Sequence, residues 1–250
     1  MRSASRLLIR GRARERTAQA AGRSALVISP HPDDETLGCG ATIARKAAAG
    51  QAVTVLMLTD GRHSHASDAL SPEELGKLRR VEAEEAMRRL GLPADALRWA
   101  DLVDGEVARH EDAVAELIGA LIQELRPDEI YVTCAEEPHP DHAAAGRAAR
   151  RASRGSGSPL WEYPVWLWGA WPLRRGDRLG STATALRWWL HRAAVVVNAD
   201  GYLATKQHAL RAYESQLGRP AGVPLGTPWP GLPRRVLAAA SEPVELFLPA

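Results

Sequence analysis

Residues 31–35, His-Pro-Asp-Asp-Glu, place one histidine and three consecutive acids in a single short stretch. The apolar run at 25–28 is typical of a buried strand, and the small and apolar residues from Thr36 onward indicate a helix. A turn between strand and helix lies at the carboxyl end of a strand, where ligands bind in open α/β sheets. The crowded carboxylates repel one another, and a bound cation would turn that repulsion into attraction.

A second cluster, His-Pro-Asp-His at 139–142, directly follows the apolar stretch 129–134, which we also predict as a strand. A catalytic zinc takes three nitrogen or oxygen ligands from the protein and leaves one position open for water. The remaining groups would then activate that water or stabilise an oxyanion. The candidate ligands are His31, one carboxylate of Asp33 and Asp34, and one imidazole of His139 and His142.

Alternating strand and helix patterns must position these two clusters. Predicted strands occupy 25–28, 52–58, 97–99 and 129–134, and predicted helices occupy 37–50, 71–90, 111–125 and 143–153. This alternation predicts a Rossmann-like, doubly wound, mostly parallel sheet with the strand order 3-2-1-4. The first and fourth strands are then neighbours at the switch point, so the two clusters face each other across one crevice.

The C-terminal part of the chain has a less regular pattern of apolar and polar residues. Residues 160–163 and 194–197 are predicted strands, 200–217 a helix, 218–233 an irregular loop and 244–248 an alternating edge strand. We find no internal repeat and no clean linker, so we expect a single domain over residues 24–250 with a C-terminal elaboration, preceded by an Arg-rich arm at 1–23.

Composition excludes several classes of protein. The chain has 250 residues, a net charge of +2, 45% hydrophobic and 25% charged residues, which is typical of a soluble globular protein. We therefore expect no nucleic-acid partner and no membrane association, and a cytoplasmic location. Cys39 and Cys134 lie in apolar stretches and are predicted to be buried thiols. Most of the eight tryptophans gather at 161–189, where we expect core packing with one or two lining a pocket.

The pairing of His31-Pro32-Asp33-Asp34-Glu35 with His139-Pro140-Asp141-His142 resembles the signature of the PIG-L/LmbE-like deacetylases, over residues 25 to about 217. Those are zinc-dependent hydrolases that remove acetyl groups from N-acetylglucosamine-type amino sugars. The resemblance implies zinc ligation by His31, Asp34 and His142. It also implies Asp33 as general base on the zinc-bound water, His139 as oxyanion stabiliser or acid, and Asp141 orienting a histidine.

Weaker matches concern the substrate. Arg79, with Glu82 one helical turn later, resembles the sugar-binding arginine's setting, and Asp104 resembles an acid that contacts sugar hydroxyls. A surface role for Arg79 and a simple turn at Asp104 are equally compatible with the sequence. Residues 206–216 resemble a late helix of the family. Thr36 and Glu35 are interpreted as structural residues: Thr36 as the N-cap of the helix, and Glu35 as an acid that the helix dipole favours at the helix start.

We therefore predict a zinc-dependent N-deacetylase with one Zn²⁺ per chain, acting on a small N-acetylated sugar or glycoconjugate and releasing acetate. Fe²⁺ is an alternative metal, because it also occupies sites of two histidines and one carboxylate. The alternative functions are an amidase acting on a larger acyl group or thiol conjugate, a metal-dependent phosphoesterase and a non-catalytic sugar-binding module. The sequence leaves the exact substrate and the oligomeric state open.

Overall fold

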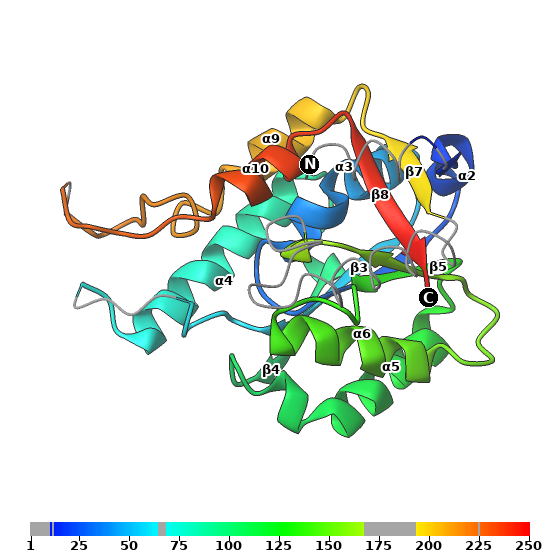
Figure 1. Ribbon diagram of the computed structural model, residues 1–250, viewed down its shortest axis with the longest axis horizontal. Helices are drawn as coiled ribbons and strands as arrows, with labels where there is room; N and C mark the ends of the chain where they lie inside the picture. Colours follow the sequence, from blue (N-terminus) through cyan, green and yellow to red (C-terminus); the bar gives the residue numbers. More distant parts are fainter. Residues whose placement is uncertain (1–10, 12, 65–68, 168–193, 225) are drawn as a thin grey trace, which may run out of the picture.

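The computed structural model describes residues 11, 13–64, 69–167, 194–224 and 226–250. A central sheet lies between two layers of helices (Figure 1). The strands are β1 (Arg14–Glu15), β2 (Ala25–Ser29), β3 (Val53–Thr59), β4 (Leu97–Leu102), β5 (Glu129–Thr133), β6 (Leu160–Tyr163), β7 (Val195–Asn198) and β8 (Val244–Pro249). The helices are α2 (Thr17–Ala21), α3 (Asp34–Ala48), α4 (Pro72–Arg89), α5 (Glu111–Leu125), α6 (Pro140–Ala152), α9 (Leu203–Leu210) and α10 (Arg234–Ala240).

The eight strands follow the order β1-β7-β8-β6-β5-β2-β3-β4. Strands β2 to β6 pair in parallel, whereas β8 runs antiparallel to both β6 and β7. The predicted order of the first four core strands is confirmed, because β4, β3, β2 and β5 are consecutive neighbours. The ends of β2 and β5 therefore lie side by side, with Ile28 in register with Val132.

Strand residues alternate between two apolar clusters, one on each face of the sheet. Val27, Val55 and Tyr131 pack on the face covered by α3, α4, α9 and α10. Leu26, Leu56 and Ile130 pack on the opposite face, against α5 and α6. Because both faces are covered, β2, β3 and β5 have continuous apolar sequences rather than alternating ones.

Three predictions about individual elements were wrong. The stretch 244–248 is no edge strand: β8 lies between β6 and β7, and four of its residues are buried. Its alternation came from Glu245, which is buried and bonded to Lys206 Nζ at 2.8 Å. Helix α3 begins at Asp34, so Asp33 rather than Thr36 is the N-cap. Helix α9 ends at Leu210, well before the predicted end, and turns follow it.

Part of the segment expected as an N-terminal arm packs on the sheet. Strand β1 pairs in parallel with β7, and α2 lies against α3. Arg16 is buried, with Nη2 3.0 Å from Glu129 Oε1 and its guanidinium over the ring of Trp161. Lys46 Nζ reaches the other oxygen of Glu129 at 2.8 Å. This ionic cluster lies at the start of β5, at the end of the sheet opposite the two His/Asp clusters.

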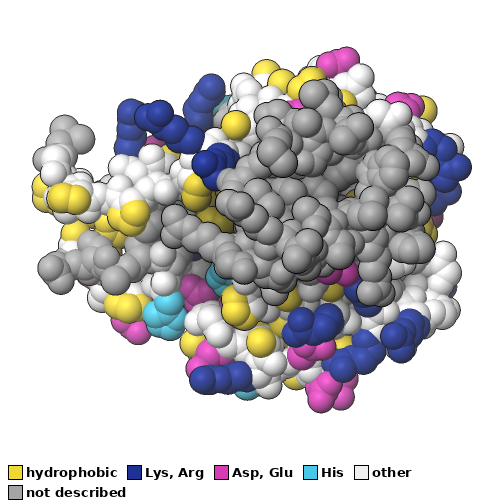
Figure 2. All heavy atoms as spheres, in the orientation of Figure 1, with side chains coloured by type: hydrophobic (Ala, Val, Ile, Leu, Met, Phe, Trp, Pro, Cys, Tyr) yellow, Lys and Arg dark blue, Asp and Glu magenta, His cyan; other side chains and the backbone are white. Residues whose placement is uncertain are grey.

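Charges of both signs lie on the surface, and the two cysteines are buried. Where Figure 2 colours the surface beside α5 and α6, basic and acidic side chains are intermixed. Arg147 and Glu111, for example, approach to 2.7 Å. Both cysteines are buried, as predicted. Among the described residues, no helix has the length and apolar character needed to cross a membrane.

Candidate active site

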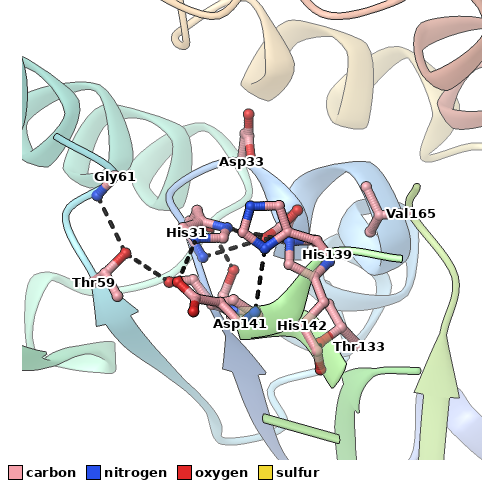
Figure 3. A network of polar contacts seen from close by, with 12 residues as sticks. His31, Asp33, Thr59, Gly61, Thr133, His139, Asp141, His142 and Val165 are labelled. Atoms are coloured by element: carbon pink, nitrogen blue, oxygen red, sulfur yellow. Dashed lines mark hydrogen bonds and ion pairs between the residues drawn. The ribbon is translucent and has the colours of Figure 1, made fainter. Parts of the chain in front are cut away.

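The ligand atoms of His31, Asp34 and His142 form a compact triangle at the carboxyl ends of β2 and β5, where Figure 3 labels the two histidines. Nδ1 of His31 lies 3.1 Å from Nε2 of His142 and 3.3 Å from Oδ2 of Asp34. Nε2 of His142 lies 3.0 Å from the same carboxylate oxygen. His31 follows β2, Asp34 opens α3 and His142 lies in the first turn of α6. The structure thus joins the two predicted clusters at the switch point.

The triangle fits a tetrahedral cation. Zinc bonds of about 2.0–2.1 Å place neighbouring tetrahedral ligands roughly 3.3 Å apart, close to the three distances observed. Nε2 of His31 faces carboxylates and is therefore its protonated nitrogen in the neutral ring, which leaves the Nδ1 lone pair directed at the other two atoms. Three electron-rich atoms converging on one point is an arrangement that a divalent cation stabilises.

The far nitrogen of His31 contacts two further acids. Nε2 lies 3.1 Å from Oδ1 of Asp104 and 3.3 Å from Oδ2 of Asp141. Burial opposes protonation, but these hydrogen bonds, together with Asp34, raise the pKa of His31 well above its ordinary value. Asp141 is itself fixed by the backbone N–H groups of Gly105 and Val107, at 2.8 and 3.2 Å. Asp141 and Asp104 therefore contact the same imidazole ring.

Asp33 lies to one side of the three imidazoles (Figure 3) and lines the adjacent pocket. Its carboxylate is 3.6 Å from Nη2 of Arg79. Burial raises the pKa of Asp33 well above its ordinary value, against the opposing charge of Arg79, and the neighbouring acids raise it further. By contrast, His142 and His31 outweigh burial and hold the pKa of Asp34 well below its usual range. The two adjacent carboxyls thus have different proton affinities.

His139 faces the pocket from the N-cap of α6. Its ring centroid is 4.8 Å from that of His31 and 4.9 Å from that of His142. Burial, followed by the like charge of these neighbours, lowers the pKa of His139 to about 4. Its Nδ1 accepts the backbone N–H of Asp141 at 3.3 Å, so the neutral ring carries its proton on Nε2. His139 can therefore donate a hydrogen bond without being charged.

Arg79 approaches from α4 and is almost fully buried. Its Nη1 donates to the carbonyl of Gly61 at 3.0 Å, and its Nη2 donates to the carbonyl of Pro32. Gly61 has φ of 65°, and a Cβ there would lie 2.2 Å from Nη1. Glycine is thus required both by the backbone and by the guanidinium. Arg79 is therefore not a surface residue.

The pocket beside the triangle has a volume of about 360 Å³, within the range of small-molecule sites. Its polar part contains the predicted residues His31, Asp33, Asp34, Arg79, Asp104 and His139, together with His63. Apolar side chains of Leu37, Trp166, Leu232 and Pro233 line another part, with Gln216. His142 and Asp141 lie buried behind His31.

Sequence reasoning missed several residues around the pocket. Leu232 and Pro233 come from a stretch predicted only as an irregular loop, and no residue type marks them as pocket residues. Of the tryptophans at 161–189, Trp166 lines the pocket, whereas Trp168 and Trp171 lie outside the described residues. Glu35 was given a purely structural role at the helix start. Its carboxylate instead accepts the N–H of Asp33 and the hydroxyl of Tyr213.

Comparison with known proteins places this geometry in context. Residues 26–153, just over half of the chain, match the family model described as PIG-L, GlcNAc-PI de-N-acetylase. The 1D-myo-inositol 2-acetamido-2-deoxy-alpha-D-glucopyranoside deacetylase of Kribbella flavida is 30% identical over 260 residues, covering 78% of this chain and 83% of that protein. The diacetylchitobiose deacetylase of Thermococcus kodakarensis is 28% identical, covering 78% and 70%.

A solved structure extends the similarity beyond the matched family model. The A40926 pseudoaglycone deacetylase Dbv21 is 26% identical and superposes with a TM-score of 0.62, covering 90% of this chain and 96% of that one. The α/β fold and both His/Asp clusters therefore occur here in a chain whose named relatives are deacetylases. The protein belongs to the PIG-L family of de-N-acetylases.

Proposed function

We propose that the protein is a zinc-dependent hydrolase that removes an N-acetyl group from a small N-acetylglucosamine-type sugar or glycoconjugate and releases acetate. The observation that carries this proposal is the triangle of His31, Asp34 and His142, with Asp33 and His139 beside it at one pocket. Such a set supplies a cation site, a base and an oxyanion donor for amide hydrolysis. The named relatives act on N-acetylated sugars, which supports the substrate class.

His31, Asp34 and His142 would hold the metal. When bound, a divalent cation lowers the pKa of a water molecule and polarises a carbonyl oxygen. The net charge of two neutral imidazoles, one carboxylate and Zn²⁺ remains positive, which favours both effects. The hydrogen bonds of His31 Nε2 to Asp104 and Asp141 orient the imidazole ring and make it a stronger ligand.

Asp33 accepts the proton that the attacking water loses. Its buried position raises its pKa, so the carboxylate is a stronger base than an exposed aspartate. The water oxygen bonds to the acetamide carbon, and the carbonyl oxygen gains the negative charge. His139 Nε2–H donates to that oxygen as a neutral ring, since its pKa is lowered to about 4. The C–N bond then breaks, and Asp33 returns its proton to the amine nitrogen.

Arg79 and Asp104 would bind the sugar. Arg79 Nε is buried without a hydrogen-bond partner among the described residues, and the guanidinium lines the pocket. Oδ1 of Asp104 contacts Nε2 of His31, and Oδ2 accepts the backbone N–H of His63 at 2.8 Å. Each carboxylate oxygen can accept a second hydrogen bond, so a sugar hydroxyl fits there without breaking these contacts.

A mass-spectrometric screen tests the proposal. Purified protein loaded with Zn²⁺ or Fe²⁺ is incubated with N-acetylglucosamine, diacetylchitobiose and an N-acetylglucosaminyl-inositol, and each product is examined for loss of one acetyl group. Parallel substrates with butyryl or longer acyl groups distinguish the amidase alternative, and a phosphomonoester distinguishes the phosphoesterase. Release of acetate with one metal per chain supports the proposal, whereas phosphate release or the absence of any deacylation contradicts it.

A further inference from the structure

Asp33 has a backbone conformation that side chains other than glycine rarely adopt. Its φ is 123° and its ψ is −29°, and only two other described non-glycine residues have positive φ. Such a conformation is unfavourable and persists only where the surroundings impose it. The residues that impose it therefore decide where the Asp33 carboxylate lies.

Contacts on three sides hold this backbone. The N–H of Asp33 donates to Oε2 of Glu35 at 3.2 Å, and its carbonyl accepts the N–H of Leu37 at 2.8 Å. The preceding carbonyl, of Pro32, accepts a hydrogen bond from Arg79 Nη2. The contact to Leu37 is an ordinary first bond of helix α3. Glu35 and Arg79 are thus the two side chains that fix the peptide group before Asp33.

Glu35 is itself rigidly held. Its carboxylate is fully buried and accepts hydrogen bonds from the hydroxyls of Ser29 at 3.1 Å and Tyr213 at 2.7 Å. Thr36 Oγ1 also donates to it, on the same oxygen as Tyr213. Tyr213 is fully buried and comes from the turns that follow α9, 178 residues away in sequence. This set connects the turn after β2 to the C-terminal part of the fold.

A role limited to the helix start does not explain these contacts. An acid that acts only on the helix dipole needs only to lie near the free N–H groups of the first turn. Glu35 is buried instead, and its Oε2 points back along the chain to the N–H of the residue two positions earlier. The opposite oxygen is occupied by Tyr213 and Thr36, so the carboxylate cannot rotate away.

We propose that Glu35, locked in place by Tyr213, is a positioning residue that holds Asp33 in its strained conformation and so aims the Asp33 carboxylate into the pocket. The inference rests on the proposed function, in which Asp33 is the base. A change of φ from 123° to the usual negative values would redirect the Cα–Cβ bond and remove the carboxylate from the pocket.

Glu35→Gln tests the inference directly. A Gln side chain has one NH₂ group in place of a carboxylate oxygen, and an NH₂ group cannot accept a hydrogen bond. It must face either the Asp33 N–H or the hydroxyls of Tyr213 and Thr36, so the hydrogen bonds on that side are lost. We expect kcat to fall about tenfold to a hundredfold, the effect of a misplaced reacting group, with KM and metal content unchanged. Tyr213→Phe, which leaves Glu35 in place, should also lower kcat, but by a smaller factor.

A double-mutant cycle separates positioning from general stabilisation. In an Asp33→Asn background the base is absent, so adding Glu35→Gln should cause no further fall in kcat. Glu129→Gln is a matched control, because Glu129 is an equally buried, ion-paired glutamate at the far end of the sheet. It should lower the melting temperature and leave kcat unchanged. If the effects of Glu35→Gln and Asp33→Asn multiply, or if Glu35→Gln loses metal, the inference is wrong.

A readout without substrate keeps the inference distinct from the proposed function. Crystal structures of metal-free wild type and Glu35→Gln should show Asp33 φ positive in the former and negative in the latter. Should Glu35→Gln fail to fold, Tyr213→Phe provides the same comparison through faster hydrogen exchange of the Asp33 amide. An unchanged Asp33 conformation in the variant overturns the inference. An absence of activity towards every substrate contradicts only the proposed function.

Discussion

At the scale of single residues, neighbouring carboxyl groups receive different properties from their surroundings. Asp33 and Asp34 are adjacent in sequence, yet His142 and His31 lower the pKa of Asp34 while burial raises that of Asp33. One carboxylate is therefore suited to binding a cation and the other to accepting a proton. Environment, rather than residue type, separates their proposed roles.

Substitutions at these positions should separate metal binding from turnover. Asp33→Asn should retain about one zinc per chain and lose most activity, with a fall in kcat of about 10²–10⁴-fold, because only the base is removed. His142→Ala should lose the metal, because one of three ligands is absent. Metal content by plasma mass spectrometry and acetate release measure the two effects. An active Asp33→Asn variant would disprove the base assignment.

The strain at Asp33 can be measured as stability. Asp33→Gly and Asp33→Ala both remove the carboxylate, but only glycine adopts φ of 123° without penalty. We expect the Gly variant to be more stable than the Ala variant by about 1 kcal/mol, the reverse of the usual order within helices. Urea unfolding of the two metal-free variants gives the difference. Equal stabilities would show that the backbone is not strained.

At the scale of elements, contacts between distant segments position the site. Helix α3 has a non-helical residue, Cys39, and the free N–H groups of Ala41 and Thr42 beyond it donate to Glu245 of β8 at 2.8 Å each. A carboxylate from the last strand thus caps the second half of the helix that begins at the site. Lys206 compensates the buried charge of Glu245.

The loop after β3 should tolerate no side chain at Gly61. A methyl group there would lie 2.2 Å from Arg79 Nη1, and φ of 65° is unfavourable for alanine. We expect Gly61→Ala to destabilise the fold by about 1–2 kcal/mol and to raise KM by displacing the guanidinium. Gly119→Ala is a suitable control, since a Cβ at Gly119 contacts nothing within 4 Å. Thermal unfolding and substrate titration measure the two effects.

Glu137 should make the stability of the metal-free protein depend on pH. Burial raises its pKa to about 8 although it accepts the N–H groups of Val165 and Leu167. Because the folded state then holds a proton that the unfolded chain releases above about pH 4.5, stability falls as pH rises from about 4.5 through 8. The Glu137 contribution has a slope of at most about 1.4 kcal/mol per pH unit.

Glu137→Gln removes that titrating group and keeps one acceptor for the backbone of residues 165–167. The difference in unfolding free energy between wild type and variant should therefore change across this pH interval, because the wild type loses stability relative to the variant as the pH rises. Urea unfolding at pH 5, 6.5 and 8 measures it. A difference that is constant with pH would contradict the raised pKa.

At the scale of the whole molecule, the metal site joins two segments that are more than a hundred residues apart. His31 and His142 follow neighbouring parallel strands, so a cation bound between them stabilises the folded chain and not the unfolded one. At a free zinc concentration one thousand times Kd, this stabilisation is about 4 kcal/mol. A chelator should lower the melting temperature of wild type but not of His142→Ala. A wild-type melting temperature that does not change when chelator is added would contradict the proposed metal site.

The strand order around the site and the two His/Asp clusters could be predicted from the amino-acid sequence, because local apolar patterns mark buried strands and parallel topology dictates which strand ends meet. The buried acids that support the site could not be predicted, because their partners come from distant segments of the chain. Glu245 interrupts an apolar strand yet is buried, since Lys206 and two helix N–H groups from other segments compensate it. Glu35 likewise reads locally as a helix-start acid, and only the packing of Tyr213 and the strained backbone of Asp33 give it a place beside the chemistry.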